Sequence, residues 1–299
     1  MTLRAILQRA TKEHWSTGHF NASESDQMRA ICEAAKEVGA PAIIGTSEGE
    51  AKHLGYFEAV ALRDAFRKEL GIPVFLNSDH HKSVEAAKRA IDAGYDSIHI
   101  DLSALTFEEN VKGTREVVEY CEVQRLNANN NILVFSRIPE YYSVEGELGY
   151  LRGDSKIQKE KIEVRPEDYT NSEQAADFVA KTGVDRLAIA VGNIHGISLD
   201  EPNLDIDRIK KIREAVPEHV ALVLHAGSGI PDDQIKAAIA AGIANIHINT
   251  DIRVAYTEAL RKELSEKPDE TTPYKFDSAA RGTLKNLIVE KLRLFGSGG

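Results

Sequence analysis

The stretch from Phe75 to Lys82 reads FLNSDHHK, and an apolar run from Ile72 to Leu76 leads directly into it. Such a run is typical of a buried strand, which here would end in a carboxylate and two imidazoles. In α/β enzymes the catalytic groups stand at the carboxyl ends of strands. Taken alone, the segment is equally compatible with a polar loop whose histidines have no catalytic role.

Other predicted strands also end in polar side chains. His195 follows the apolar run 186–191 within GNIHG, and His225 directly follows the run 220–224. In SIHIDL at 97–102, His99 and Asp101 share one face because side chains alternate along a strand. Segment 142–148 places Glu145 and Glu147 on one face in the same way.

The spacing of these strands predicts the fold. Amphipathic helices are expected between them, for example over 56–70 and 206–215, and AGYDSIHID at 93–101 is echoed by AGIANIHIN at 241–249. About eight such units close a (β/α)8 TIM barrel. The rival is an open doubly wound sheet, which is weakened because no GxGxxG follows the first strand. We expect a single domain over 1–299 with a C-terminal helical extension at about 278–295 and an exposed loop over 153–168.

The composition narrows the class of partner. The formal charge of −10 argues against a nucleic-acid or anionic membrane surface, so a small molecule is the expected partner. Only Cys32 and Cys121 occur, which predicts neither a disulfide framework nor a thiolate metal cluster. With no secretory signal or membrane span in the sequence, we expect a cytoplasmic protein.

Three histidines at equivalent strand ends indicate a metal site. In a barrel, His80, His195 and His225 would converge on one face. Three neutral imidazoles with an open fourth position form a catalytic divalent-metal site, most simply for Zn²⁺. Glu147 and Asp101 could add an oxygen ligand or orient the imidazoles.

Further strand-end patterns indicate a phosphate site and a group for proton transfer. The glycine-rich turn HAGSG at 225–229 precedes a helix, so its backbone N–H groups could hold a phosphate, with Gly196 and Thr250 nearby. Ser47 ends another strand and is a candidate substrate contact. Asp79 precedes His80, so its carboxylate would lie near a metal-bound substrate and suits proton transfer.

The motifs together resemble the class II, metal-dependent ketose-bisphosphate aldolases, which include the fructose-bisphosphate and tagatose-bisphosphate enzymes. The resemblance runs through FNASESDQ, TSEGEAKHLG, SDHH, IDLSALTFEENV, VEGELG, AVGNIHG, LVLHAGSGIPDD and INTD, in the family's order. It implies cleavage of a phosphorylated ketose to dihydroxyacetone phosphate and an aldehyde, and a homo-oligomer, either dimer or tetramer. It also implies a divalent cation, with a monovalent cation as a further candidate.

The resemblance assigns roles to individual positions. It implies metal ligands at His80, His195 and His225, with Glu147 as an accessory ligand and Asp79 as the acid/base at the cleaved bond. It implies phosphate binding by a second set of residues, which are Gly196, Gly227, Ser228 and Thr250.

The sequence departs from the family pattern at the site. The family usually has two glycines after the last histidine ligand, where this sequence has Ala226 and Gly227. His247 and Asn249 replace the Asn-x-Asp that contacts substrate in typical members. In the loop after ELG, Asp154 is the candidate replacement for a proton-transferring glutamate. A metal-dependent hydrolase and a ligand-binding homologue without turnover therefore remain alternatives.

Overall fold

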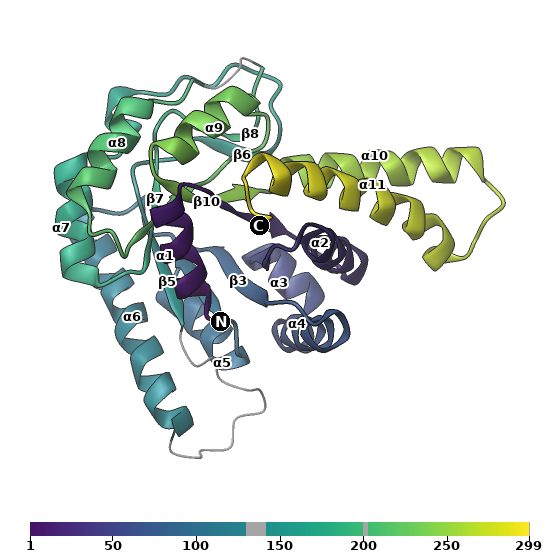
Figure 1. Cartoon of the computed structure of the whole chain (residues 1–299), viewed down its shortest axis with the longest axis horizontal. Helices are drawn as coiled ribbons and strands as arrows, with labels where there is room; N and C mark the ends of the chain where they lie inside the picture. The colour runs from purple at the N-terminus through teal and green to yellow at the C-terminus, as the bar shows by residue number, and fades with distance from the viewer. Residues whose placement is uncertain (130–141, 200–202, 299) are drawn as a thin grey trace.

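Eight parallel strands form a closed barrel in the computed structural model, which describes residues 1–129, 142–199 and 203–298 (Figure 1). Around the barrel the strands follow the order β1-β10-β9-β7-β5-β4-β3-β2, so that β10 and β1 close the ring. Their bounds are β1 (Thr17–Asn21), β2 (Ala42–Ser47), β3 (Val74–His81), β4 (Ser97–Ile100), β5 (Ser143–Leu148), β7 (Arg186–Ile189), β9 (Ala221–Leu224) and β10 (Ile243–Ile248). The predicted (β/α)8 TIM barrel is confirmed.

Helices cover the outside of the barrel (Figure 1). They are α2 (Ser25–Val38), α4 (Tyr56–Leu70), α5 (Val84–Ala93), α6 (Phe107–Asn129), α7 (Ser172–Thr182), α8 (Ile206–Ala215) and α9 (Asp232–Ala240). Local sequence explains their ends: the Ser83 hydroxyl caps α5 by accepting from the Ala86 N–H at 3.1 Å, and Gly94 ends it with a φ of 99°. The helices at 56–70 and 206–215 have the predicted bounds.

Two helices that the sequence analysis missed flank the first strands. They are α1 (Leu3–Glu13) and α3 (Glu48–Leu54). The α3 helix is short and polar, and it begins with a capping box between Ser47 and Glu50. The sequence also predicts a strand at 132–135, a segment that lies outside the described residues.

The C-terminal helix is longer than expected. Helix α11 (Pro273–Leu294) packs against α2 and against α10 (Thr250–Glu266). Helices α10 and α11 form a hairpin that projects from the barrel (Figure 1). Leu284, Ile288 and Leu292 are the buried apolar positions of α11. No helix in the described ranges is long and apolar enough to cross a bilayer.

Segment 153–168 is not only a loop. Strand β6 (Gly153–Ile157) pairs in parallel with β8 (His195–Ile197), and the short helix η1 (Pro166–Asp168) follows. Most side chains of β6 are exposed, which explains why its sequence carries no apolar signal. This pair of strands holds His195 beside the barrel mouth.

Polar side chains fill much of the barrel interior. A connected group of buried residues from several strands takes the place of the usual aliphatic layers; it consists of His19, Asn77, His99, Glu145, Arg186, Asn245 and His247. Buried polar groups are costly unless they are hydrogen-bonded, so such a set is typical of a functional interior.

Candidate active site and metal centre

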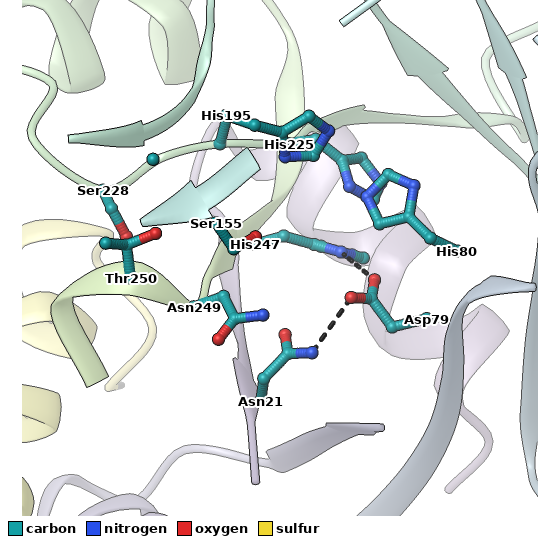
Figure 2. Close-up of a pocket in the computed structure, with 12 residues that line it drawn as sticks. Asn21, Asp79, His80, Ser155, His195, His225, Ser228, His247, Asn249 and Thr250 are labelled. Atoms are coloured by element: carbon teal, nitrogen blue, oxygen red, sulfur yellow. Dashed lines mark hydrogen bonds and ion pairs between the residues drawn. The ribbon is translucent and has the colours of Figure 1, made fainter. Parts of the chain in front are cut away.

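The three predicted histidines converge at the carboxyl ends of the strands (Figure 2). The ring of His80 lies 4.9 Å from that of His195 and 4.5 Å from that of His225, between centroids. His80 has a φ of 46°, a conformation that non-glycine residues rarely adopt and that is typical of functional sites. The sequence therefore located this cluster correctly.

Donor atoms in the cluster are spaced as a cation requires. One atom from each of Asp79, His80, His99 and His225 lies within 4.8 Å of the others, and His80, Asp101 and Glu147 form a second such set. His99 was not predicted as a ligand, whereas His195 belongs to no such set among the described residues. The Nε2 of His99 and the Oε2 of Glu147 form a buried ion pair at 3.1 Å, and neither atom makes a further hydrogen bond.

A bound cation would give these buried atoms a further partner. The electrostatic field also favours positive charge: burial alone would lower the pKa of His99, but Glu145 and the neighbouring carboxylates raise it well above its ordinary value. Nitrogen and oxygen donors of this kind suit a divalent metal. The residues present therefore fit the divalent cation predicted from the sequence.

Asp101 orients the first histidine of the cluster. Its Oδ2 accepts a hydrogen bond from Nδ1 of His80 at 2.9 Å, and its Oδ1 accepts one from the Ser103 hydroxyl at 2.6 Å. Burial opposes ionisation, but His80 holds the pKa of Asp101 well below its usual range. With Nδ1 engaged in this way, Nε2 of His80 is the nitrogen left to ligate a metal.

Asp79 is buried between two donors (Figure 2). Asn21 donates from Nδ2 to its Oδ2 at 3.0 Å, and Nδ1 of His247 lies 3.2 Å from its Oδ1. Burial would raise the pKa of Asp79, but His80 and His247 hold it well below its ordinary value. Asp79 is thus a carboxylate at the edge of the histidine cluster, positioned to accept a proton.

A small pocket beside the cluster contains most of the predicted phosphate contacts. Ser228, Asn249 and Thr250 line it together with Asp79 and the histidines (Figure 2). Gly196 belongs to the same lining. A Cβ at Gly196 would come within 2.1 Å of the Lys156 carbonyl oxygen, so only glycine fits there.

The N–H of Gly227 is engaged elsewhere. It donates to the carbonyl of His247 at 2.9 Å, so a phosphate role for this residue stays a prediction. His247 lies in the pocket wall, where its ring stacks on His19 with centroids 3.6 Å apart.

A wider cleft of about 640 Å³ opens from the cluster. Ser47 and Asp154 both line it. The Ser47 hydroxyl accepts the Glu50 N–H at 3.4 Å, and the Asp154 side chain is 76% exposed and lies 2.8 Å from the Lys156 ammonium. Their functional roles stay predictions.

Sequence reasoning missed residues that support the site from inside the barrel. Glu145 accepts from Nε2 of His225 at 2.6 Å, and the N–H of His80 donates to Nδ1 of His99 at 3.1 Å. The alternation of side chains along a strand had predicted that His99 lies on the same face as Asp101, and Glu145 on the same face as Glu147. This pattern does not reveal which residue of another strand each of them contacts.

The fold and the site together define a class of protein. A parallel barrel whose strand ends carry a histidine–carboxylate cluster, a buried carboxylate beside it and an adjoining polar pocket is a barrel enzyme with a site suited to a divalent metal.

Comparison with known proteins refines this class. The family model for class II fructose-bisphosphate aldolase matches residues 1–299. The fructose-bisphosphate aldolase of Geobacillus stearothermophilus is 34% identical over 302 residues, which cover 100% of this chain and 98% of that protein. The 6-phospho-5-dehydro-2-deoxy-D-gluconate aldolase of Bacillus licheniformis is 35% identical over 302 residues, which cover 100% of this chain and 96% of that protein.

A solved structure agrees with these matches. The crystal structure of the YdjI aldolase from Escherichia coli K12 superimposes with a TM-score of 0.81 at 32% identity, covering 99% of this chain and 97% of that one. The chain belongs to the class II fructose-bisphosphate aldolase family and is an aldolase, a carbon–carbon lyase.

Proposed function

We propose that this aldolase reversibly cleaves a phosphorylated ketose, fructose 1,6-bisphosphate or a related sugar, to dihydroxyacetone phosphate and an aldehyde. The observation that carries the proposal is that one pocket is lined by the buried Asp79 carboxylate, the histidines of the cluster, and Ser228 and Thr250. A ketose phosphate presents a hydroxyl, a carbonyl and a phosphate in that order. The carboxylate would act on the hydroxyl, the metal site on the carbonyl, and Ser228 and Thr250 would bind the phosphate.

The metal site would take Zn²⁺ or another divalent cation. His80, His195 and His225 would hold it, with Glu147 as an accessory ligand. When bound, such a cation supplies Lewis-acid polarisation of the substrate carbonyl. The hydrogen bond from Nδ1 of His80 to Asp101 fixes the ring and leaves Nε2 as the nitrogen that would bind the cation. A monovalent cation is a further candidate, and no residues are assigned to bind it.

Asp79 would perform the proton transfer at the bond that is cleaved. In the cleavage direction its carboxylate takes the proton from the hydroxyl, and in condensation it returns that proton. Asn21 holds its Oδ2 from the other side, so the carboxylate is oriented before substrate binds. Asp154, at the edge of the cleft, is the proposed group for the proton at the ketose carbon.

The phosphate would lie against Gly196, Ser228 and Thr250. Helix α10 begins at Thr250, and its N–H groups carry partial positive charge toward the pocket. The N–H of Asp251 donates to the Ser228 hydroxyl at 3.1 Å, which fixes that side chain beside the helix start. Asn249 lines the same pocket and would contact the substrate from the strand side.

An aldolase with altered turnover is the second candidate. His247 favours it, because its Nδ1 already lies within hydrogen-bonding distance of the carboxylate that would move the proton.

A cytoplasmic location, a single-domain organisation and a dimeric or tetrameric assembly also stay proposals drawn from the sequence.

Metal removal tests the proposed function. The purified protein, assayed with fructose 1,6-bisphosphate and with a panel of other ketose phosphates, should lose cleavage activity after chelation and regain it with Zn²⁺. Full activity in metal-free protein would refute the metal-dependent mechanism. Metal and dihydroxyacetone phosphate binding without hydron exchange at the ketose carbon would favour the second candidate.

A further inference from the structure

His99 is a buried imidazole inside the histidine cluster that the proposed mechanism does not use. It stands on β4, which lies between β3, the strand of His80, and β5, the strand of Glu147. Its ring centroid lies 4.6 Å from that of His80 and 4.6 Å from that of His225, and its side chain has no exposed surface. His99 therefore contacts groups of both neighbouring strands at the centre of the proposed metal site.

One nitrogen of this ring holds the backbone of His80. A backbone N–H can only donate, so Nδ1 of His99 is the acceptor in their 3.1 Å hydrogen bond. The contact falls where the pairing of β3 with β4 is irregular, between positions 78 and 81 of β3. An irregularity of this kind leaves main-chain groups without a partner on the next strand. The imidazole thus supplies an acceptor in place of the main chain of β4.

The bend at His80 explains how two successive residues reach the same pocket. Successive side chains of a regular strand point to opposite faces of the sheet, but Asp79 and His80 both line the small pocket. The φ of 46° at His80 breaks the alternation, and such a backbone costs a residue with a Cβ about 1–2 kcal/mol. The hydrogen bond from His80 to His99 therefore stabilises the arrangement that puts the proposed acid/base beside a proposed metal ligand.

The other nitrogen of the ring faces the proposed accessory ligand. Nε2 of His99 lies 3.1 Å from Oε2 of Glu147, whose side chain is 2% exposed. The same oxygen lies 3.6 Å from Nδ1 of His80, and Oε1 of Glu147 lies 3.5 Å from the Ser103 hydroxyl oxygen. The contact to His99 is the shortest of the three, so this imidazole sets the position of the carboxylate more closely than the other two groups do.

We propose that His99 is a positioning residue of the metal centre, which holds the backbone of His80 and the carboxylate of Glu147 in place for a divalent cation. The inference rests on the proposed metal-dependent function. One nitrogen of His99 lies within reach of the neighbouring donor atoms, but both of its nitrogens are engaged by other groups. His99 therefore supports the ligands and is not one itself.

Amide substitutions separate the two contacts of the ring. The side-chain oxygen of asparagine takes about the place of Nδ1, so His99→Asn keeps an acceptor for the His80 N–H and has no group at Nε2. The side-chain nitrogen of glutamine takes about the place of Nε2, so His99→Gln keeps a donor toward Glu147 and loses that acceptor. His99→Phe keeps a ring and removes both. His219→Asn, on an exposed turn between α8 and β9, is the matched control.

Zn²⁺ affinity, measured by competition with a chromophoric chelator, is the first readout. Loss of a group that positions a metal ligand typically lowers the affinity by about 10- to 100-fold, which is the change expected for His99→Phe. Each amide variant should lie between His99→Phe and the wild type, and His219→Asn should match the wild type. Glu147→Gln should cost less affinity in the His99→Asn background than in the wild type, because the carboxylate has already lost its support there.

Cleavage at saturating Zn²⁺ is the second readout, and it reports on the bend at His80. His99→Gln should lower kcat more than His99→Asn does, because only asparagine keeps the acceptor for the His80 N–H. A catalytic group that is misplaced by about 1 Å can cost about 100-fold in rate, which sets the scale of the expected difference. Denaturant unfolding shows which variants are folded, and the comparison of the two amides decides the question if His99→Phe is not.

Two results would overturn the assignment. The first is wild-type Zn²⁺ affinity in every His99 variant. The second is an absorption spectrum of Co²⁺-loaded His99→Gln that shows one nitrogen ligand fewer than the wild type, because His99 would then be a ligand itself. A wild type that binds Zn²⁺ but cleaves no ketose phosphate would refute the proposed reaction, and the affinities would still decide the role of His99.

Discussion

Nη1 of Arg186 lies 2.6 Å from Oε2 of Glu145 in the interior of the barrel, and neither side chain is exposed. The other oxygen of Glu145 accepts from His225. Arg186 thereby holds the pKa of Glu145 well below its ordinary value, although burial opposes this. A charged pair in the core thus connects directly to a proposed metal ligand.

Removing the arginine should be strongly destabilising. Arg186→Met leaves the Glu145 carboxylate buried without its cation, and breaking a buried ion pair in this way costs about 3–5 kcal/mol. Denaturant unfolding of the variant should show this loss. The double variant Arg186→Met, Glu145→Gln should recover much of it, because no uncompensated charge then remains. A single variant as stable as the wild type would show that the pair contributes nothing.

Asp79→Asn should separate chemistry from metal binding. The amide keeps the size of the carboxylate but cannot accept a proton, so kcat for cleavage should fall by about 10²- to 10⁴-fold. Metal content, measured by atomic absorption, should stay near that of the wild type because the histidines are unchanged. Unaltered turnover in this variant would mean that another group transfers the proton.

Asp101→Asn should weaken the metal site without removing a proposed ligand. The substitution replaces an ionised acceptor for Nδ1 of His80 with a neutral one, and the loss of such a partner typically costs about 10- to 100-fold in metal affinity. Competition with a chromophoric chelator measures this change. Asp177→Asn, at a surface pair with Lys181, is the control and should bind metal like the wild type. Equal affinity in all three proteins would exclude an orienting role for Asp101.

The barrel and the strand-end histidines were predictable because each depends on local sequence. An apolar run, a glycine at the end of the next helix and a polar residue after the strand recur along the chain, and topology then brings His80, His195 and His225 together. The order of strands and helices along the chain is enough to predict that these three histidines lie close together.

The interior partners were not predictable in the same way. Arg186 and Glu145 lie on adjacent strands β7 and β5, but their pairing depends on register and side-chain direction, which a single sequence does not encode in an obvious pattern. Strand β6 was missed because its exposed side chains show no apolar alternation.

Ala226→Gly should relieve backbone strain next to the site. Ala226 has a φ of 55°, and a residue with a Cβ pays about 1–2 kcal/mol for that conformation, partly offset by the greater freedom of glycine in the unfolded chain. We therefore expect a gain of about 0.5–1 kcal/mol in the free energy of unfolding. Thermal and denaturant unfolding would check it, and a lower stability would contradict the strain argument.

Gly196→Ala should damage the phosphate pocket, and Gly282→Ala supplies a matched control. At Gly196 the φ is 94° and an added Cβ would meet two backbone carbonyl oxygens, those of Lys156 at 2.1 Å and Asp154 at 2.6 Å. The β6–β8 pair must shift to make room, so KM for the ketose phosphate should rise by at least about tenfold if one charged hydrogen bond is lost. At Gly282, on an exposed turn of α11, an added Cβ meets nothing within 4 Å, so alanine there should raise stability by about 1 kcal/mol and leave KM unchanged. Because both variants add the same methyl group, a rise in KM confined to Gly196→Ala would locate phosphate binding at the β6–β8 pair, and equal KM values would place it elsewhere.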